Sequence, residues 1–207
     1  MSESKESALE ALAYLRGVAA DSGSGQVSRS TGLLFAVAGF AYGAQALLIW
    51  ATMVGLPTPP GTGLLSAAAA TGVFIAACIY VFWRERGGLI QKGVAARAIS
   101  GLFAGAGIAN AAMVIAFGSA ASKAGDWSIW ALYPSVLAAL QGAAWFAAAM
   151  ISRRLWLGVV AFGWYATAAL LGVLVGDARY MLVLGLGLAG FMGGPGLYLM
   201  LRKPTMS

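Results

Sequence analysis

The feature that most constrains this chain is a series of six apolar stretches separated by short polar connectors. A helix rises about 1.5 Å per residue, so a stretch of about 20 residues crosses the roughly 30 Å hydrocarbon layer of a bilayer. The sequence therefore predicts an all-α integral membrane protein, built as a six-transmembrane-helix bundle. The expected spans are residues 33–54, 64–83, 98–117, 128–150, 155–175 and 180–201.

Composition supports this class of protein. Of 207 residues, 60% are hydrophobic and 10% are charged, whereas charged residues make up about 25% of a soluble domain. The formal net charge of +6 could suggest nucleic acid. However, the basic residues lie between the apolar stretches, where they orient a protein in the membrane, and no nucleic-acid motif accompanies them. We expect the lipid bilayer as the partner, and no nucleic acid.

The distribution of basic residues predicts the orientation. If the N-terminus lies inside, eleven of the 13 Lys and Arg residues are on the inner side and two on the outer side, as the positive-inside rule requires. Both termini are then cytoplasmic, in the inner membrane of a bacterial-type cell. We expect a cytoplasmic segment at 1–31 with a short amphipathic helix at 8–20, a transmembrane domain at 32–203 and a tail at 204–207.

Small residues predict where helices pack closely. Residues 98–117 are crowded with glycine and alanine, so we expect this span to be the central packing helix of the bundle. Glycines four positions apart allow two helix backbones to approach each other. The packing positions predicted in this way are Gly39 and Gly43 in the first span, and Gly101 and Gly105 in the third.

Three carboxamides, Gln45, Asn110 and Gln141, fall near the middle of three different spans. An amide in hydrocarbon seeks a hydrogen-bond partner, and interhelical bonds of this kind contribute about 0.6 kcal/mol on average. Two interpretations follow. The three amides hold their helices together, or they form a polar lining for the path of a small solute. The first is favoured.

A second candidate feature is a helix break near the end of the sixth span, at Gly193, Gly194, Pro195 and Gly196. Proline removes a helical hydrogen bond, and the glycines around it loosen the backbone. The favoured interpretation is a packing kink. The alternative is an unwound stretch that binds an ion or substrate, as in the broken helices of transporters.

The sequence offers little catalytic chemistry. It contains no histidine and a single cysteine, Cys78, and no charged residue lies near the middle of a span. The run at 185–190 matches G-x-G-x-x-G, but it lacks the strand and the later acidic residue of a dinucleotide site. We therefore expect no enzyme, no cofactor and no metal site.

Two hypotheses for the function follow. The first is a non-enzymatic membrane protein that scaffolds, senses or regulates, with a protein partner at its cytoplasmic face. The second is a small-solute transporter or channel lined by the three carboxamides.

Overall fold

The computed structural model describes residues 29–84 and 94–201, which form helices joined by short turns. The expected amphipathic helix at 8–20 lies outside the described residues, as does most of the basic connector after the second span. The helices are α2 (Arg29–Met53), α3 (Thr62–Arg84), α4 (Val94–Ala124), α5 (Ser128–Ala131), α6 (Tyr133–Ser152), α7 (Leu155–Val173), α8 (Arg179–Leu188), the π-helix η1 (Ala189–Gly193) and α9 (Gly194–Leu201).

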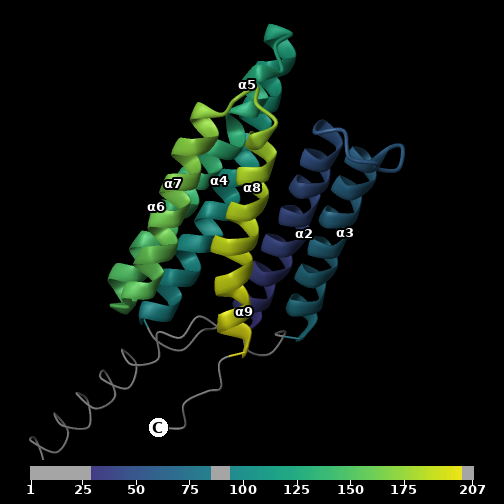
Figure 1. Ribbon diagram of the computed structural model, residues 1–207. Coiled ribbons are helices and arrows are strands. Elements are labelled where there is room, and N and C mark those ends of the chain that lie inside the picture. The colour runs from purple at the N-terminus through teal and green to yellow at the C-terminus, as the bar shows by residue number, and fades with distance from the viewer. Residues whose placement is uncertain (1–28, 85–93, 202–207) are drawn as a thin grey trace, which may run out of the picture.

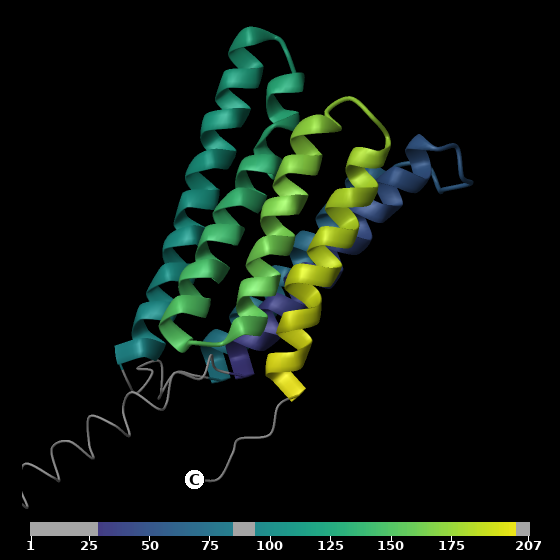
Figure 2. The same cartoon turned by 60° about the vertical axis from the view of Figure 1, so that its left-hand side comes forward.

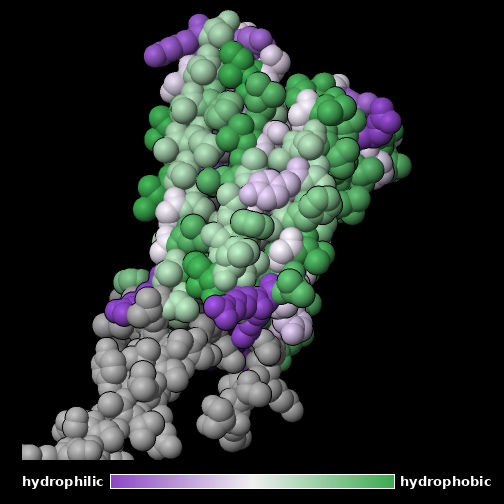
Figure 3. All heavy atoms as spheres, turned by 90° about the vertical axis from the view of Figure 1, so that its left-hand side faces the viewer, coloured by the Kyte–Doolittle hydropathy of each residue, from purple (hydrophilic) through white to green (hydrophobic). Residues whose placement is uncertain are grey.

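Within residues 29–84 and 94–201 the structure confirms six helices that are long and apolar enough to cross a membrane. In that count, α5 continues into α6, and α8, η1 and α9 form one span. On the face drawn in Figure 3, hydrophobic residues cover the middle of the bundle and hydrophilic residues gather at its ends. This distribution fits a bilayer around the middle of the bundle.

The third span is longer than expected, because α4 covers 31 residues. Most of the predicted loop at 119–127 is therefore helical. The helix ends where Gly125 adopts a positive φ of 64°, and the amide of Asp126 donates to the carbonyl of Ala121 at 3.2 Å. A glycine in this left-handed conformation is a common way for a helix to terminate.

The six spans are arranged as an arc (Figures 1 and 2). Starting from one end, α3 packs against α2, α2 against the last span, α8 against α7, α7 against α6, and α6 against α4. Helices α6 and α7 are antiparallel neighbours, as their three-residue connector predicts. Because α3 and α4 lie at opposite ends of the arc, each makes its main contacts on one side only.

The prediction that the third span lies at the centre is wrong. Only 11% of the most apolar window of this span is buried, whereas 39% of the equivalent window of α2 is buried. Helix α2 instead packs against α3 on one side and the last span on the other, and the window of α7 is 44% buried. Small residues permit a close contact, but the contact also needs a partner helix of matching shape.

Glycines carry the contact between α2 and the last span. A β-carbon added to Gly39 would lie 2.1 Å from the backbone nitrogen of Gly193, and one added to Gly196 would lie 2.3 Å from the nitrogen of Ala36. A further β-carbon on Gly43 would lie 3.0 Å from the carbonyl oxygen of Gly185. These distances leave no room for a side chain at the two tightest positions, so backbone packs directly on backbone.

A π-helical turn, Ala189–Gly193, ends at the first residue of the predicted break, whereas Gly194, Pro195 and Gly196 are the first residues of α9. The amide of Gly194 donates to the carbonyl of Ala189, five residues earlier, which is the π-helical pattern. Pro195 has no N–H to offer the carbonyl of Phe191, four residues before it. That carbonyl instead accepts a hydrogen bond of 3.1 Å from the indole of Trp164 in α7. The segment is thus a bulged helix with its freed carbonyl satisfied by a neighbouring helix.

Candidate functional site

A cavity of about 560 Å³ lies inside the arc, and all six spans contribute to its wall. It is mainly apolar, with a few polar side chains. Its lining is nearer the end of the bundle that carries the turn after α2 and the loop between α7 and α8. Its lining includes Tyr42, Gln45, Ala67, Thr71, Phe74, Asn110, Val114, Trp130, Tyr133, Leu137, Gln141, Trp164, Met181, Leu184, Leu188 and Met192.

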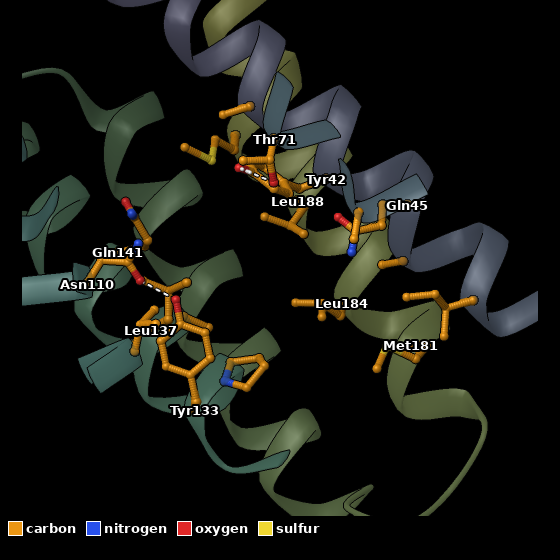
Figure 4. A pocket seen from close by; sticks show the side chains of 18 of the residues that line it. Tyr42, Gln45, Thr71, Asn110, Tyr133, Leu137, Gln141, Met181, Leu184 and Leu188 are labelled. Atoms are coloured by element: carbon orange, nitrogen blue, oxygen red, sulfur yellow. Dashed lines mark hydrogen bonds between the residues drawn. The ribbon is translucent and has the colours of Figure 1, made fainter. Parts of the chain in front are cut away.

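The three predicted carboxamides, Gln45, Asn110 and Gln141, all line this cavity. Figure 4 shows Asn110 and Gln141 on one wall, and Gln45 on the opposite wall. The hydrogen bond of Asn110 is made with Tyr133, whose hydroxyl donates to the amide oxygen. Asn110 therefore joins α4 to α6 through a tyrosine, and the structure does not pair it with Gln45 or Gln141.

Gln141 has a buried amide oxygen that lacks a hydrogen-bond partner among the described residues. A buried acceptor left unpaired costs free energy, on the order of 1 to 3 kcal/mol. Most buried polar groups in proteins are paired, so each exception calls for an explanation. Among the described residues, the indole nitrogen of Trp145, four residues further along α6, is likewise a buried polar atom without a partner.

The cavity meets the surface of the bundle between α3 and α4. Of the residues that line it, only Thr71 in α3 and Val114 in α4 are exposed. Beside this opening the hydroxyl of Tyr42 lies 3.5 Å from that of Thr71 and donates to it. Because α3 and α4 are the two ends of the arc, the opening faces the side of the bundle.

Three aromatic rings close the bundle on the side of the cavity away from the turn after α2. The ring of Phe35 lies 4.8 Å from that of Phe103 and 5.2 Å from that of Trp145, and the last two are 5.1 Å apart. Trp145 is completely buried. Phe35 precedes the cavity residue Tyr42 by seven residues, which is about 10 Å along a helix. We call Phe35, Phe103 and Trp145 the aromatic triad; it joins α2, α4 and α6.

The other predicted positions have different surroundings. The contact between α2 and the last span contains Gly39, Gly43, Gly193 and Gly196, and Pro195 is buried beside them. A β-carbon added to Gly194 would have its nearest neighbour, the carbonyl oxygen of Ala189, at 3.9 Å. Added β-carbons at Gly101 and Gly105 would meet nothing within 4 Å. The predicted break contributes no lining residue, although Met192 in the adjoining π-helix does.

Sequence reasoning missed the aromatic part of the site. Tyr42, Phe74, Tyr133 and Trp164 line the cavity but carry no motif. Helical spacing holds a usable signal, because Tyr133, Leu137 and Gln141 follow one another at intervals of four and therefore share one face of α6. Tyr42 and Gln45 are three residues apart and likewise share a face of α2.

The lining contains no Asp, Glu, Lys or Arg. Within residues 29–84 and 94–201, no group of three or more His, Cys, Asp or Glu side chains could hold a metal ion. The acidic residues in the loops are held in their ionised form. Hydrogen bonds from Ser128 lower the pKa of Asp126, and hydrogen bonds from Arg179 lower the pKa of Asp177 to about 2.

Comparison of the chain with models of known protein families, with curated proteins and with solved structures found no match. The geometry of the cavity is therefore the basis for a functional proposal. The hypothesis of a protein partner at the cytoplasmic face depends on segments that are mostly outside the described residues, and it stays a prediction.

Proposed function

We propose that this protein is a membrane carrier that binds a small, uncharged solute in its central cavity. The observation that carries this proposal is a cavity of about 560 Å³ with an apolar wall and a few polar side chains. Small-molecule sites in proteins span roughly 300–1,000 Å³ and have walls of this kind. A purely structural bundle gains nothing from such a space, because unfilled volume lowers stability.

The aromatic triad supports a carrier rather than a channel. A channel needs a continuous path across the membrane, whereas two buried rings and the partly buried ring of Phe103, from three helices, are packed together beside the cavity. In a carrier, one end of the binding site is closed while the other is accessible, and the helices rearrange to exchange the two states. The three rings are then the closed gate, and transport requires them to separate.

The absence of charged lining residues supports a neutral solute and a cycle that does not use protons. Binding should therefore be the same at about pH 5 and pH 8. The lowered pKa of Asp177, about 2 against an ordinary 3.8, keeps its ion pair with Arg179 formed over this range. Its contribution to stability is lost only as the pH falls through the lowered value. With cytoplasmic termini and an inner-membrane location, as the basic residues predict, the cavity lies in the outer half of the bilayer.

The binding proposal is tested with two adjacent alanines of α3. Ala67 lines the cavity, whereas Ala68 is exposed on the outside of the helix. The unfolding temperature of the purified protein is measured against a library of neutral alcohols, amides and ketones. Bound ligand stabilises the folded state. We expect a compound that stabilises the wild type and Ala68→Phe but not Ala67→Phe, and the absence of any such compound would contradict the proposal.

Transport is tested by counterflow of the compound found in this way. Vesicles that contain the protein are loaded with unlabelled compound, and uptake of labelled compound from outside is followed. A carrier gives a transient accumulation of label, whereas a channel gives only equilibration. Replacing Trp145 with alanine opens the triad and should convert accumulation into simple leakage.

A further inference from the structure

We infer that the solute carries a carbonyl-type oxygen on a flat apolar body, and that the amide nitrogen of Asn110 donates a hydrogen bond to this oxygen. This inference rests on the proposed function, because it names the chemical class of the ligand of the same cavity. Three observations support it: the free polar groups of the lining, the orientation of Asn110 and the aromatic rings around the cavity.

The amide nitrogens of the three carboxamides are the free donors of the lining. The hydroxyls of Tyr42 and Tyr133 and the indole of Trp164 already donate hydrogen bonds within the protein. The amide nitrogens, in contrast, donate to no other described residue. Among the described residues, the fully buried polar atoms without a partner are the amide oxygen of Gln141 and the indole nitrogen of Trp145. The three amide nitrogens therefore keep accessible surface.

The amide oxygens are less available than the nitrogens. The oxygen of Asn110 accepts the hydroxyl proton of Tyr133, and the oxygen of Gln141 is sealed from the cavity. The amide oxygen of Gln45 is the third, and it is accessible. The lining thus offers three amide NH₂ groups against one free amide oxygen. Since donors need acceptors, the group that a neutral solute must bring is an acceptor, for which a carbonyl oxygen is the simplest choice.

Asn110 is the carboxamide whose orientation is fixed. Its oxygen is held by the hydroxyl of Tyr133, which comes from another helix. The amide group is planar and carries oxygen and nitrogen on the same carbon, so holding the oxygen also directs the nitrogen. No described residue holds the amides of Gln45 and Gln141 by a hydrogen bond. A donor that is already in place loses less entropy on binding, so Asn110 is the donor and Tyr133 is a positioning residue.

Aromatic rings determine the body of the solute. The rings of Tyr42 in α2 and Phe74 in α3 lie 6.0 Å apart. Those of Trp130 and Tyr133, in α5 and α6, are stacked with centroids 5.2 Å apart. Figure 4 shows Tyr42 and Tyr133 on different walls. Aromatic rings favour offset or edge-to-face contacts with a further ring. A flat ring that carries the carbonyl therefore fits this cavity better than a branched aliphatic body.

The test uses two probes of nearly the same shape, 4-fluoroacetophenone and 1-fluoro-4-isopropenylbenzene. They differ in whether the side group contains C=O or C=CH₂, so only the first offers an acceptor. Saturable binding to the full chain in detergent micelles is measured by fluorine NMR at neutral pH. We expect the ketone to bind about tenfold more tightly than the hydrocarbon, which is the effect of one hydrogen bond. Equal affinities would overturn this inference and leave the proposed function standing.

Variants of the two walls locate the donor. In Asn110→Leu the affinity for the hydrocarbon should be unchanged, and the affinity for the ketone should fall to the same value. Gln45→Leu is the control on the opposite wall and should keep the tenfold ratio. Tyr133→Phe retains the amide but releases its oxygen, so the ratio should fall there too, even if Asn110→Leu does not fold. A ratio that persists in Asn110→Leu or Tyr133→Phe, or that is lost in Gln45→Leu, would overturn the assignment to Asn110.

A second pair of variants separates this inference from the proposed function. In Ala67→Phe, where a ring fills the cavity, saturable binding of both probes should disappear. In Ala68→Phe, where the ring lies outside, it should remain. Persistence of binding in Ala67→Phe would mean that the cavity is not the binding site, so the proposed function would fail together with the inference.

Discussion

Helices α2 and α4 are both rich in small residues, yet they occupy opposite kinds of position. In α2, an added β-carbon at Gly39 would collide with the backbone of the last span. In α4, added β-carbons at Gly101, Gly105 and Gly107 would meet nothing within 4 Å. Sequence composition alone does not separate the two helices.

The difference lies in the partner. The face of the last span that meets α2 also carries glycines, namely Gly185, Gly193 and Gly196. Both helices therefore lack side chains where they touch. Helix α4 packs on α6 through other residues, including the ring of Phe103 against Trp145. Close packing of membrane helices depends on van der Waals complementarity, which is a property of the pair of helices. A glycine pattern in one helix is therefore insufficient evidence for a contact.

The largest expected effect is at the matched contact. Gly39→Val places branched carbons where 2.1 Å separates an ideal β-carbon from the backbone of Gly193. Since backbone atoms cannot turn aside as a side chain can, we expect a loss of more than about 3 kcal/mol of stability, or failure to fold. The free energy of unfolding in detergent measures this. Gly105→Val is the matched control and should be close to the wild type; equal damage in both variants would refute the comparison.

The second prediction concerns the π-helical turn of the last span. Trp164→Phe removes the donor to the carbonyl of Phe191, which Pro195 has left without its helical partner. We expect a loss of about 2 kcal/mol in the free energy of unfolding, because a partly buried carbonyl becomes unpaired. Pro195→Ala restores an N–H four residues after Phe191, so Trp164→Phe should cost less in that background. Equal costs in both backgrounds would show that the proline and the indole act independently.

The sequence was sufficient for the parts of the fold that depend on local properties. The spans follow from uncharged apolar runs, and the reversal between α6 and α7 follows from a connector too short for anything else. The helix ends were less predictable, because α4 runs on as far as Gly125, where the positive φ stops it.

The site was predictable only in part. Depth along each span placed Gln45, Asn110 and Gln141 at similar levels, and all three line the cavity. Their actual partners could not be predicted, because whether Asn110 meets Tyr133 or Gln141 depends on how each helix is rotated about its axis. The position of α4 at the end of the arc was missed for the same reason, since it depends on which faces meet.

The third prediction tests how α4 is held at the end of the arc. The hydroxyl of Tyr133 and the amide of Asn110 join α6 to α4. A double-mutant cycle of Tyr133→Phe and Asn110→Leu, read as free energy of unfolding, should give a coupling of about 0.6 to 1.7 kcal/mol, the range for such bonds in membranes. A coupling near zero would mean that the ring contacts of Phe103 hold α4 without help from this bond.

The smallest expected effect has the opposite sign. Replacing Gly101, Gly105 and Gly107 together with alanine adds three methyl groups to open space and removes glycine from the interior of a helix. In water each change favours the helix by up to about 1 kcal/mol; in a bilayer, where the backbone hydrogen bonds already hold the helix, we expect a smaller total gain. The free energy of unfolding and the molecular mass of the protein in detergent are both measured. A fall in stability, or a mass that differs from that of the wild type, would show that another protein surface covers these glycines. Helix α4 would then pack closely against a second protein molecule.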